Sequence, residues 1–200
     1  MSAARLSIKG LAGRRGGRLL FAGLDLDLAA GQSALIAGPN GIGKSSLLRI
    51  VSGLLAPFAG TIDAAGTIAL TDEAAALDRE KVLRAALGFW TKLDGASPNR
   101  IDAALADLGI AHLAEIPVRI LSTGQRKRAA LARTIVSGAD IWLLDEPANG
   151  LDAASVQALV TVVERHRAGG GIVLAASHMP LGWRHDAELT LAAPAEEAAA

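Results

Sequence analysis

The sequence predicts an α/β fold with a small antiparallel β edge and an inserted α-helical lobe. Two apolar runs, Ile141–Leu144 and Ile172–Ala176, are continuous rather than alternating, which is typical of strands buried on both faces of a sheet. A segment with helical character, Ala153–His166, connects them. Between about residues 74 and 136 the character of the chain changes to helical spacing. We therefore expect a core made of residues 1–73 and 137–200 and a helical lobe made of residues 74–136.

The N-terminal part of the chain supplies the predicted β edge and the first core elements. Leu24–Leu28 alternates strictly between apolar and acidic residues, as a half-buried strand does. Ser45–Leu55 is predicted to be a helix, with Leu47, Leu48, Val51 and Leu54 on one face. The other short apolar segments are predicted to be strands: Arg5–Lys9, Leu19–Phe21, Ala34–Ala37 and Thr67–Leu70.

Later elements follow from the same patterns. Lys81–Lys92 and Arg100–Leu108 have helical spacing, and a further helix is expected after Pro117. Glu188–Leu191 is expected as an edge strand. The tail from residue 194 onward is expected to be frayed.

Composition excludes several classes of protein. About half of the 200 residues are apolar (51%), 20% are charged, and the formal net charge is zero. Bulk charge therefore gives no support to nucleic-acid binding. The chain has no Cys, which excludes disulfides and thiolate metal sites. No uncharged apolar stretch reaches the length of a membrane span, so any membrane contact is expected through a partner only.

A glycine-rich loop between a predicted strand and a predicted helix matches the pattern G-x-x-x-x-G-K-[ST]. Glycines allow backbone N–H groups to approach phosphate oxygens, and the helix start adds the positive end of its dipole. Lys44 should reach the β- and γ-phosphates, and the Ser45 hydroxyl should bind Mg²⁺. The alternative is a glycine-rich turn that binds nothing. The predicted nucleotide-binding residues are Gly38, Pro39, Asn40, Gly41, Ile42, Gly43, Lys44, Ser45 and Ser46.

The predicted buried strand Ile141–Leu144 is followed by two acidic residues, Asp145 and Glu146. With a phosphate loop upstream, Asp145 is expected to hold Mg²⁺ through water, and Glu146 to polarise the attacking water. Taken alone, the same pattern fits a strand that leads into a solvated turn, with Pro147 enforcing the end.

The segment Leu121–Gln125 reads Leu-Ser-Thr-Gly-Gln. Ser122 and Gln125 have the spacing of a capping box, so a well-capped helix is one interpretation. However, basic residues at 126–128 crowd the first turn, where the helix dipole disfavours cations. A bound anion would compensate for them, so an anion site is the other interpretation.

The order of these motifs resembles that of ATP-binding cassette (ABC) ATPases, which contain a P-loop NTPase core. The phosphate loop, Leu121–Gln125, the Asp-Glu pair, Asn149–Asp152 and Ser177-His178 occur in the family's order along the whole chain. The resemblance implies binding and hydrolysis of ATP with Mg²⁺.

The resemblance also implies a head-to-tail homodimer that traps two ATP molecules. In the family the pentapeptide, here Leu121–Gln125, completes the site of the other subunit, and the residues of it that the resemblance assigns to nucleotide binding are Ser122, Thr123, Gly124 and Gln125. Asp152 corresponds to the loop that couples the two sites. His178 corresponds to the residue that contacts the γ-phosphate and orients the water, although a lone His is more often a surface or core residue.

Two short segments, Glu115–Ser122 and Ser177–Leu181, together with the short chain, are similar to one subgroup of the family. That subgroup powers heme export, or release of a heme-loaded chaperone, in bacterial cytochrome c maturation. It implies an integral membrane permease as partner and a peripheral location on the cytoplasmic face of the inner membrane.

The sequence departs from the family at two places. No aromatic residue precedes the phosphate loop where the family stacks adenine, and Arg14 or Arg15 could stack there instead. The family's Gln after the next strand is missing, and Asp72 or Glu73 could approach Mg²⁺ in its place.

Some alternatives stay open at this stage. Phe89 and Trp90 could line a groove for the permease or could be ordinary core residues. The ATPase could serve another exporter, could act on nucleic acid or the ribosome outside transport, or could bind nucleotide without turnover. The absence of a second cassette, a long insertion or a basic tract disfavours the nucleic-acid role. The residues that disfavour the inactive module are the intact Lys44, Asp145, Glu146 and His178.

Overall fold

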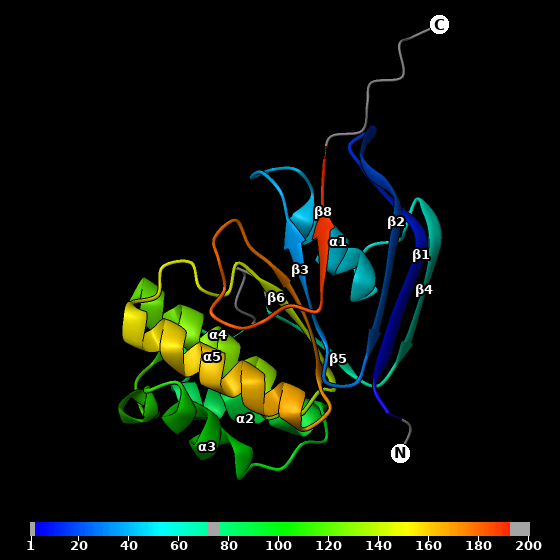
Figure 1. Cartoon of the computed structure of the whole chain (residues 1–200). Helices are drawn as coiled ribbons and strands as arrows, with labels where there is room; N and C mark the ends of the chain where they lie inside the picture. Colours follow the sequence, from blue (N-terminus) through cyan, green and yellow to red (C-terminus); the bar gives the residue numbers. More distant parts are fainter. Residues whose placement is uncertain (1–2, 72–76, 193–200) are drawn as a thin grey trace, which may run out of the picture.

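The computed structural model describes residues 3–71 and 77–192 and contains two sheets and two layers of helices (Figure 1). One sheet is parallel and lies in the middle of the molecule, and the other is antiparallel and lies at one side. The predicted α/β fold with an antiparallel β edge is confirmed. The frayed tail predicted from residue 194 lies outside the described residues.

The central sheet has the strand order β5-β6-β7-β3-β8, with every pairing parallel. All five residues of β6 and all five of β7 are buried, as their unbroken apolar runs predicted. The predicted edge strand is also present, as β8. The strands are β3 (Ser33–Ala37), β5 (Ile68–Thr71), β6 (Ile141–Asp145), β7 (Ile172–Ala176) and β8 (Ala187–Thr190).

The antiparallel sheet has the order β2-β1-β4. A tight turn at Gly16 and Gly17, both with positive φ, joins β1 (Arg5–Arg15) to β2 (Arg18–Ala29). Strand β2 contains both segments that the sequence predicted as separate strands. Strand β4 (Ala59–Ala65) was not predicted, because it has no buried residue and hence no apolar alternation.

Five α-helices and two 3-10 turns complete the described residues. Helix α1 ends earlier than predicted, because the chain turns at Gly53, where φ is +79°. No helix of the described residues combines the length and apolar character that crossing a bilayer requires. The helices are α1 (Lys44–Val51), α2 (Leu83–Leu93), α3 (Arg100–Asp107), α4 (Thr123–Ser137) and α5 (Ala153–Ala168), and the 3-10 turns are Ala111–Leu113 and Val118–Ile120.

Both faces of the parallel sheet are covered. Alternate residues of β6 point to opposite sides, so Ile141 and Leu143 face one core while Trp142 and Leu144 face the other. Helix α1 fills the first core, between the two sheets, and α2 to α5 close the second (Figure 1). This packing leaves the carboxyl ends of β3, β6 and β7 at one edge of the sheet, where the loops with predicted site residues begin.

A stacked pair of rings, Trp142 and His166, packs at the opposite edge. Their centroids lie 3.7 Å apart and their planes are 5° from parallel. A β-carbon added at Gly171 would overlap the His166 ring. We therefore expect Gly171→Ala to destabilise the fold by about 1–3 kcal/mol through overpacking.

The control for this prediction is Gly169→Ala. A β-carbon there would lie 3.4 Å from the nearest atom, an ordinary contact, so the loss should stay within about 0.5 kcal/mol. Urea unfolding of both variants measures the difference. Equal stability of the two variants would contradict the overlap at Gly171.

Burial of the His166 ring lowers its pKa, although the Asp140 charge and two backbone hydrogen bonds oppose that shift. His166 therefore takes up its proton at a higher pH in the unfolded chain than in the folded chain. Stability is complete above the unfolded value of about 6.5 and falls as pH drops through the folded value, by at most about 1.4 kcal/mol per pH unit for this group.

We expect His166→Phe, which keeps a flat ring on Trp142, to flatten the decline of unfolding free energy between neutral and mildly acidic pH. Urea titrations at several pH values measure the slope. The same substitution at the exposed His112 is the control and should leave the slope unchanged. An unchanged slope in His166→Phe would show that other groups cause the decline.

Candidate functional site

The phosphate loop joins β3 to α1 and depends on backbone shapes that favour glycine. Gly43 is the residue before α1 and has φ +119°. Gly38 has φ +138°, and a β-carbon there would lie 2.8 Å from the Leu191 carbonyl oxygen. A residue with a β-carbon would be strained at either position. Glycine at both positions therefore leaves the backbone N–H groups of the loop accessible to a ligand.

The Lys44 side chain lies folded against this loop and is 6% exposed. Its Nζ donates to the carbonyl oxygens of Gly38 and Pro39, at 2.7 and 3.3 Å. It also lies 3.6 Å from Oε1 of Glu146. The ammonium group is thus held where the loop turns, beside the end of strand β6.

Glu146 follows β6 directly and is the only residue other than glycine with positive φ in the described chain, at +45°. Its N–H donates to the Ala176 carbonyl oxygen, which fixes the turn against the end of β7. Its Oε2 lies 2.9 Å from Nδ1 of His178, which comes just after β7. The strained backbone therefore presents the carboxylate between Lys44 and His178.

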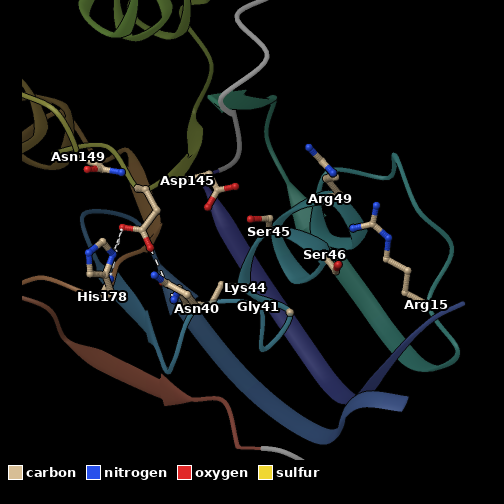
Figure 2. Close-up of a pocket in the computed structure, with 12 residues that line it drawn as sticks. Arg15, Asn40, Gly41, Lys44, Ser45, Ser46, Arg49, Asp145, Asn149 and His178 are labelled. Atoms are coloured by element: carbon tan, nitrogen blue, oxygen red, sulfur yellow. Dashed lines mark hydrogen bonds and ion pairs between the residues drawn. The ribbon is translucent and has the colours of Figure 1, made fainter. Parts of the chain in front are cut away.

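These groups line one pocket of about 380 Å³ (Figure 2). His178 and Asn149 lie at one end of it, and Arg15 and Ser46 lie at the other. Glu146 lies at the first end, beside His178. The predicted residues that line it are Asn40, Gly41, Gly43, Lys44, Ser45, Ser46, Asp145, Glu146 and His178. Sequence reasoning did not assign Arg49 or Asn149 to this site.

Three predicted loop residues do not line this pocket. Gly38 and Pro39 line a neighbouring cavity behind the loop, together with His178. Their carbonyl groups still meet Lys44. Ile42 is partly buried and packs against the core around α1.

Ser45 and Asp145 provide oxygen donors to the same pocket. A hydroxyl and a carboxylate are hard oxygen ligands, which Mg²⁺ prefers. The described residues contain no cluster of three or more His, Asp or Glu side chains that could hold a metal by themselves. The donor set therefore fits an Mg²⁺ ion that keeps several waters and arrives with a phosphate ligand.

The pentapeptide lies at the start of α4 and does not line the pocket. Ser122 and Gln125 form the capping box: the Ser122 N–H donates to Gln125 Oε1 at 2.8 Å, and the Gln125 N–H donates to Ser122 Oγ at 3.3 Å. Ser122 and Thr123 are exposed, and Gly124 is half-buried beside the Gly150 carbonyl oxygen. Within one chain, the structure leaves Ser122 and Thr123 open to solvent.

The three cations of the first turn have intramolecular partners. Arg126 donates to the Leu121 carbonyl oxygen at 2.6 Å, Lys127 to that of Asp145 at 3.1 Å, and Arg128 to that of Leu108 at 3.3 Å. Carbonyl oxygens thus compensate for these charges. The cations alone therefore do not distinguish the capped helix start from the anion site, and both interpretations stay open.

Asp152 caps the next helix, α5. Its Oδ1 accepts from the Ser155 N–H at 2.7 Å, and this hydrogen bond lowers the pKa of Asp152. It does not line the pocket of its own chain. Asp72 and Glu73, the two candidates to replace the missing Gln, lie outside the described residues.

Comparison with known proteins decides the family. Residues 21–149, more than half of the chain, match the ABC transporter family. The chain belongs to the ABC transporter family. In this ABC transporter chain the phosphate loop and the Asp-Glu pair both fall within the matched residues.

The chain is similar to the cytochrome c biogenesis ATP-binding export protein CcmA of several bacteria, so the predicted subgroup resemblance is confirmed. It is 54% identical to the Zymomonas mobilis protein over 89% of this chain and 80% of that one. It is 52% identical to the Sphingopyxis alaskensis protein over 88% and 91% of the two chains. Among solved structures, a Pyrococcus furiosus chain described as an ABC transporter ATP-binding protein superposes with a TM-score of 0.82 at 26% identity, covering 94% of this chain and 97% of that one.

Proposed function

We propose that this chain is the ATP-hydrolysing subunit of an ABC exporter in cytochrome c biogenesis, and that the exporter handles heme or a heme-loaded chaperone. The observation that carries the hydrolytic role is the placement of Lys44, Glu146 and His178 around one pocket beneath a phosphate loop. The similarity to CcmA proteins supports the biological role.

In this proposal, the loop amides from Gly38 to Ser46 bind the phosphates of ATP. Lys44 leaves the carbonyl groups of Gly38 and Pro39 and pairs with the β- and γ-phosphates. Ser45 and, through water, Asp145 would hold Mg²⁺, and the ion would supply positive charge to neutralise what develops on the phosphates.

Glu146 then acts as general base, because its carboxylate lies next to the place where the terminal phosphate would meet water. Movement of Lys44 to the phosphates removes one of the two groups that now pair with this carboxylate. His178, 2.9 Å from it, keeps the carboxylate oriented and contacts the terminal phosphate.

We propose a head-to-tail homodimer as the active form. The pocket of one chain has no contribution from Ser122, Thr123, Gly124 or Gln125, although these residues form a capped helix start, a place where anions bind. They would close the pocket of the partner over the γ-phosphate, and Asp152 would lie between the two sites.

The membrane contact is proposed to occur only through an integral permease, on the cytoplasmic face of the bacterial inner membrane. The proposed lobe of residues 74–136 exposes Phe89 on α2, with 55% of the residue accessible. This exposure disfavours the core interpretation for Phe89. Trp90 packs partly against the core, and the central carbon of the Arg133 guanidinium lies 4.3 Å from the centre of its ring. Its ring is therefore covered, and we assign it the role of supporting Phe89.

Complementation tests the biological role. In a bacterium that lacks its own copy of this gene, the wild-type chain should restore covalent heme in c-type cytochromes, and Lys44→Ala should not. Heme staining after denaturing electrophoresis measures the result, with an antibody against the chain confirming equal amounts. Normal cytochromes without the gene, together with ATPase activity of the purified chain, would assign it to another exporter. Salt-sensitive binding to RNA or DNA would favour the role outside transport.

A further inference from the structure

The two ends of the nucleotide pocket differ in what they can recognise. His178 marks the end where the terminal phosphate would lie (Figure 2), and Glu146 contacts His178 there. Ser46 and Arg15 lie at the other end, which leaves that end for the nucleoside. A nucleoside base is usually held by a flat group that can stack on it.

No aromatic ring reaches that end. The chain has three Phe, three Trp and no Tyr. Phe21 is buried below Gly13, and Phe58 lies under the Arg14 guanidinium, 5.6 Å from its carbon. The remaining rings lie on the other side of the parallel sheet, on α2 or in the core that α2 to α5 close: Phe89, Trp90, Trp142 and Trp183.

The structure distinguishes the two arginines that end strand β1. Neighbouring residues of a strand point to opposite faces. Arg14 is already engaged, because its Nε donates to the Gly17 carbonyl oxygen at 2.9 Å and its guanidinium covers Phe58. Arg15 points into the pocket, and in the described part of the chain its guanidinium has no hydrogen bond or ion pair.

We propose that the Arg15 guanidinium is the stacking platform for the base, in place of an aromatic ring. A guanidinium group is planar and weakly hydrated, so it stacks on the faces of aromatic rings. The tight turn at Gly16 and Gly17 holds the end of β1 beside the pocket. This inference rests on the proposed ATP site and names the residue that recognises the base.

A consequence is weak selection between purines. Stacking uses the face of a base, which adenine and guanine share, and does not read the edge that distinguishes them. A guanidinium group also carries only donors, and guanine offers two acceptors on its edge. We therefore expect the wild-type chain to hydrolyse GTP with a KM within about threefold to tenfold of that for ATP.

Three substitutions at one position separate stacking from simple charge. Arg15→Ala should raise the KM for ATP about 3- to 30-fold with kcat nearly unchanged. Arg15→Lys keeps the charge but loses the plane, so it should behave like Arg15→Ala. Arg15→Tyr keeps a plane without the charge and should retain a KM near the wild-type value. Arg14→Ala is the matched control and should leave KM unchanged.

Inorganic tripolyphosphate, which has no base, provides the second measurement. Its inhibition constant against ATP hydrolysis should be the same in wild type and in Arg15→Ala. If Arg15→Lys binds ATP as the wild type does, while Arg15→Tyr and Arg15→Ala lose affinity for both ATP and tripolyphosphate, then Arg15 pairs with phosphate and the proposal is wrong. If the wild-type KM for GTP is more than 50-fold above that for ATP, which corresponds to about 2.3 kcal/mol, the chain selects strongly between the two purines. That result would contradict the expected weak selection. A wild-type chain that neither binds nor hydrolyses ATP would refute the proposed function itself, which is a different result.

Discussion

Replacing Glu146 with Gln should slow ATP hydrolysis by about 10²- to 10⁴-fold while ATP still binds. The amide has nearly the same shape as the carboxylate but cannot accept the proton of the attacking water. It also keeps a hydrogen-bond partner for His178, which lies 2.9 Å from the carboxylate in the wild type. With hydrolysis blocked, the closed dimer should persist.

Light scattering after size-exclusion chromatography measures this result in the presence of ATP and Mg²⁺. Glu146→Gln should elute as a dimer with ATP and as a monomer with ADP. Lys44→Ala is the control and should stay monomeric in both, because its phosphate contact is missing. If Glu146→Gln stays monomeric with ATP while the wild type hydrolyses it, the proposed sandwich dimer is falsified.

Two inactive variants should partly restore each other when they are mixed. Lys44→Ala removes the phosphate contact of one pocket, and Ser122→Arg places a bulky cation at the segment proposed to close the pocket of the partner. In a mixed dimer one site combines both defects and the other has none. Equal mixing should therefore recover up to about a quarter of the wild-type activity, since half of the dimers are mixed and each has one intact site.

The measurement is phosphate release by each variant alone and by the mixture. Co-purification through a tag on one variant confirms that mixed dimers form. A variant with both substitutions, mixed with either single variant, is the control and should recover nothing. If tagged mixed dimers form but activity stays at the sum of the separate variants, then each chain closes its own pocket and the shared arrangement is wrong.

Much of the fold could be predicted because its strong signals are local. The buried strands β6 and β7 are unbroken apolar runs, and their exposure in the structure agrees with that pattern. Strand β4 was missed for the same physical reason. It is an edge strand with no buried residue, and its place depends on backbone pairing to β1, which leaves no mark in hydrophobicity.

The site was predictable where spacing fixes geometry and not where partners are distant. The phosphate loop and the acids at residues 145 and 146 have motif spacing, and the structure brings them into one pocket. Arg49 could have been found, since it lies four residues after Ser45 and so on the same helical face. The carbonyl partners of the cations at 126–128 could not, because those of Lys127 and Arg128 lie 18 and 20 residues away.

The hydrogen bond between Lys127 and the Asp145 carbonyl oxygen connects the two sites of the proposed dimer. Lys127 belongs to α4, whose start would close the site of the partner, and it donates to the main chain of Asp145, which serves the site of its own chain. In the proposed dimer, a shift of α4 when it closes over the ATP of the partner would be transmitted through this hydrogen bond to the end of β6, at the site of its own chain. This hydrogen bond gives a direct contact between the two sites within each subunit, and we expect hydrolysis at the two sites of the proposed dimer to be cooperative.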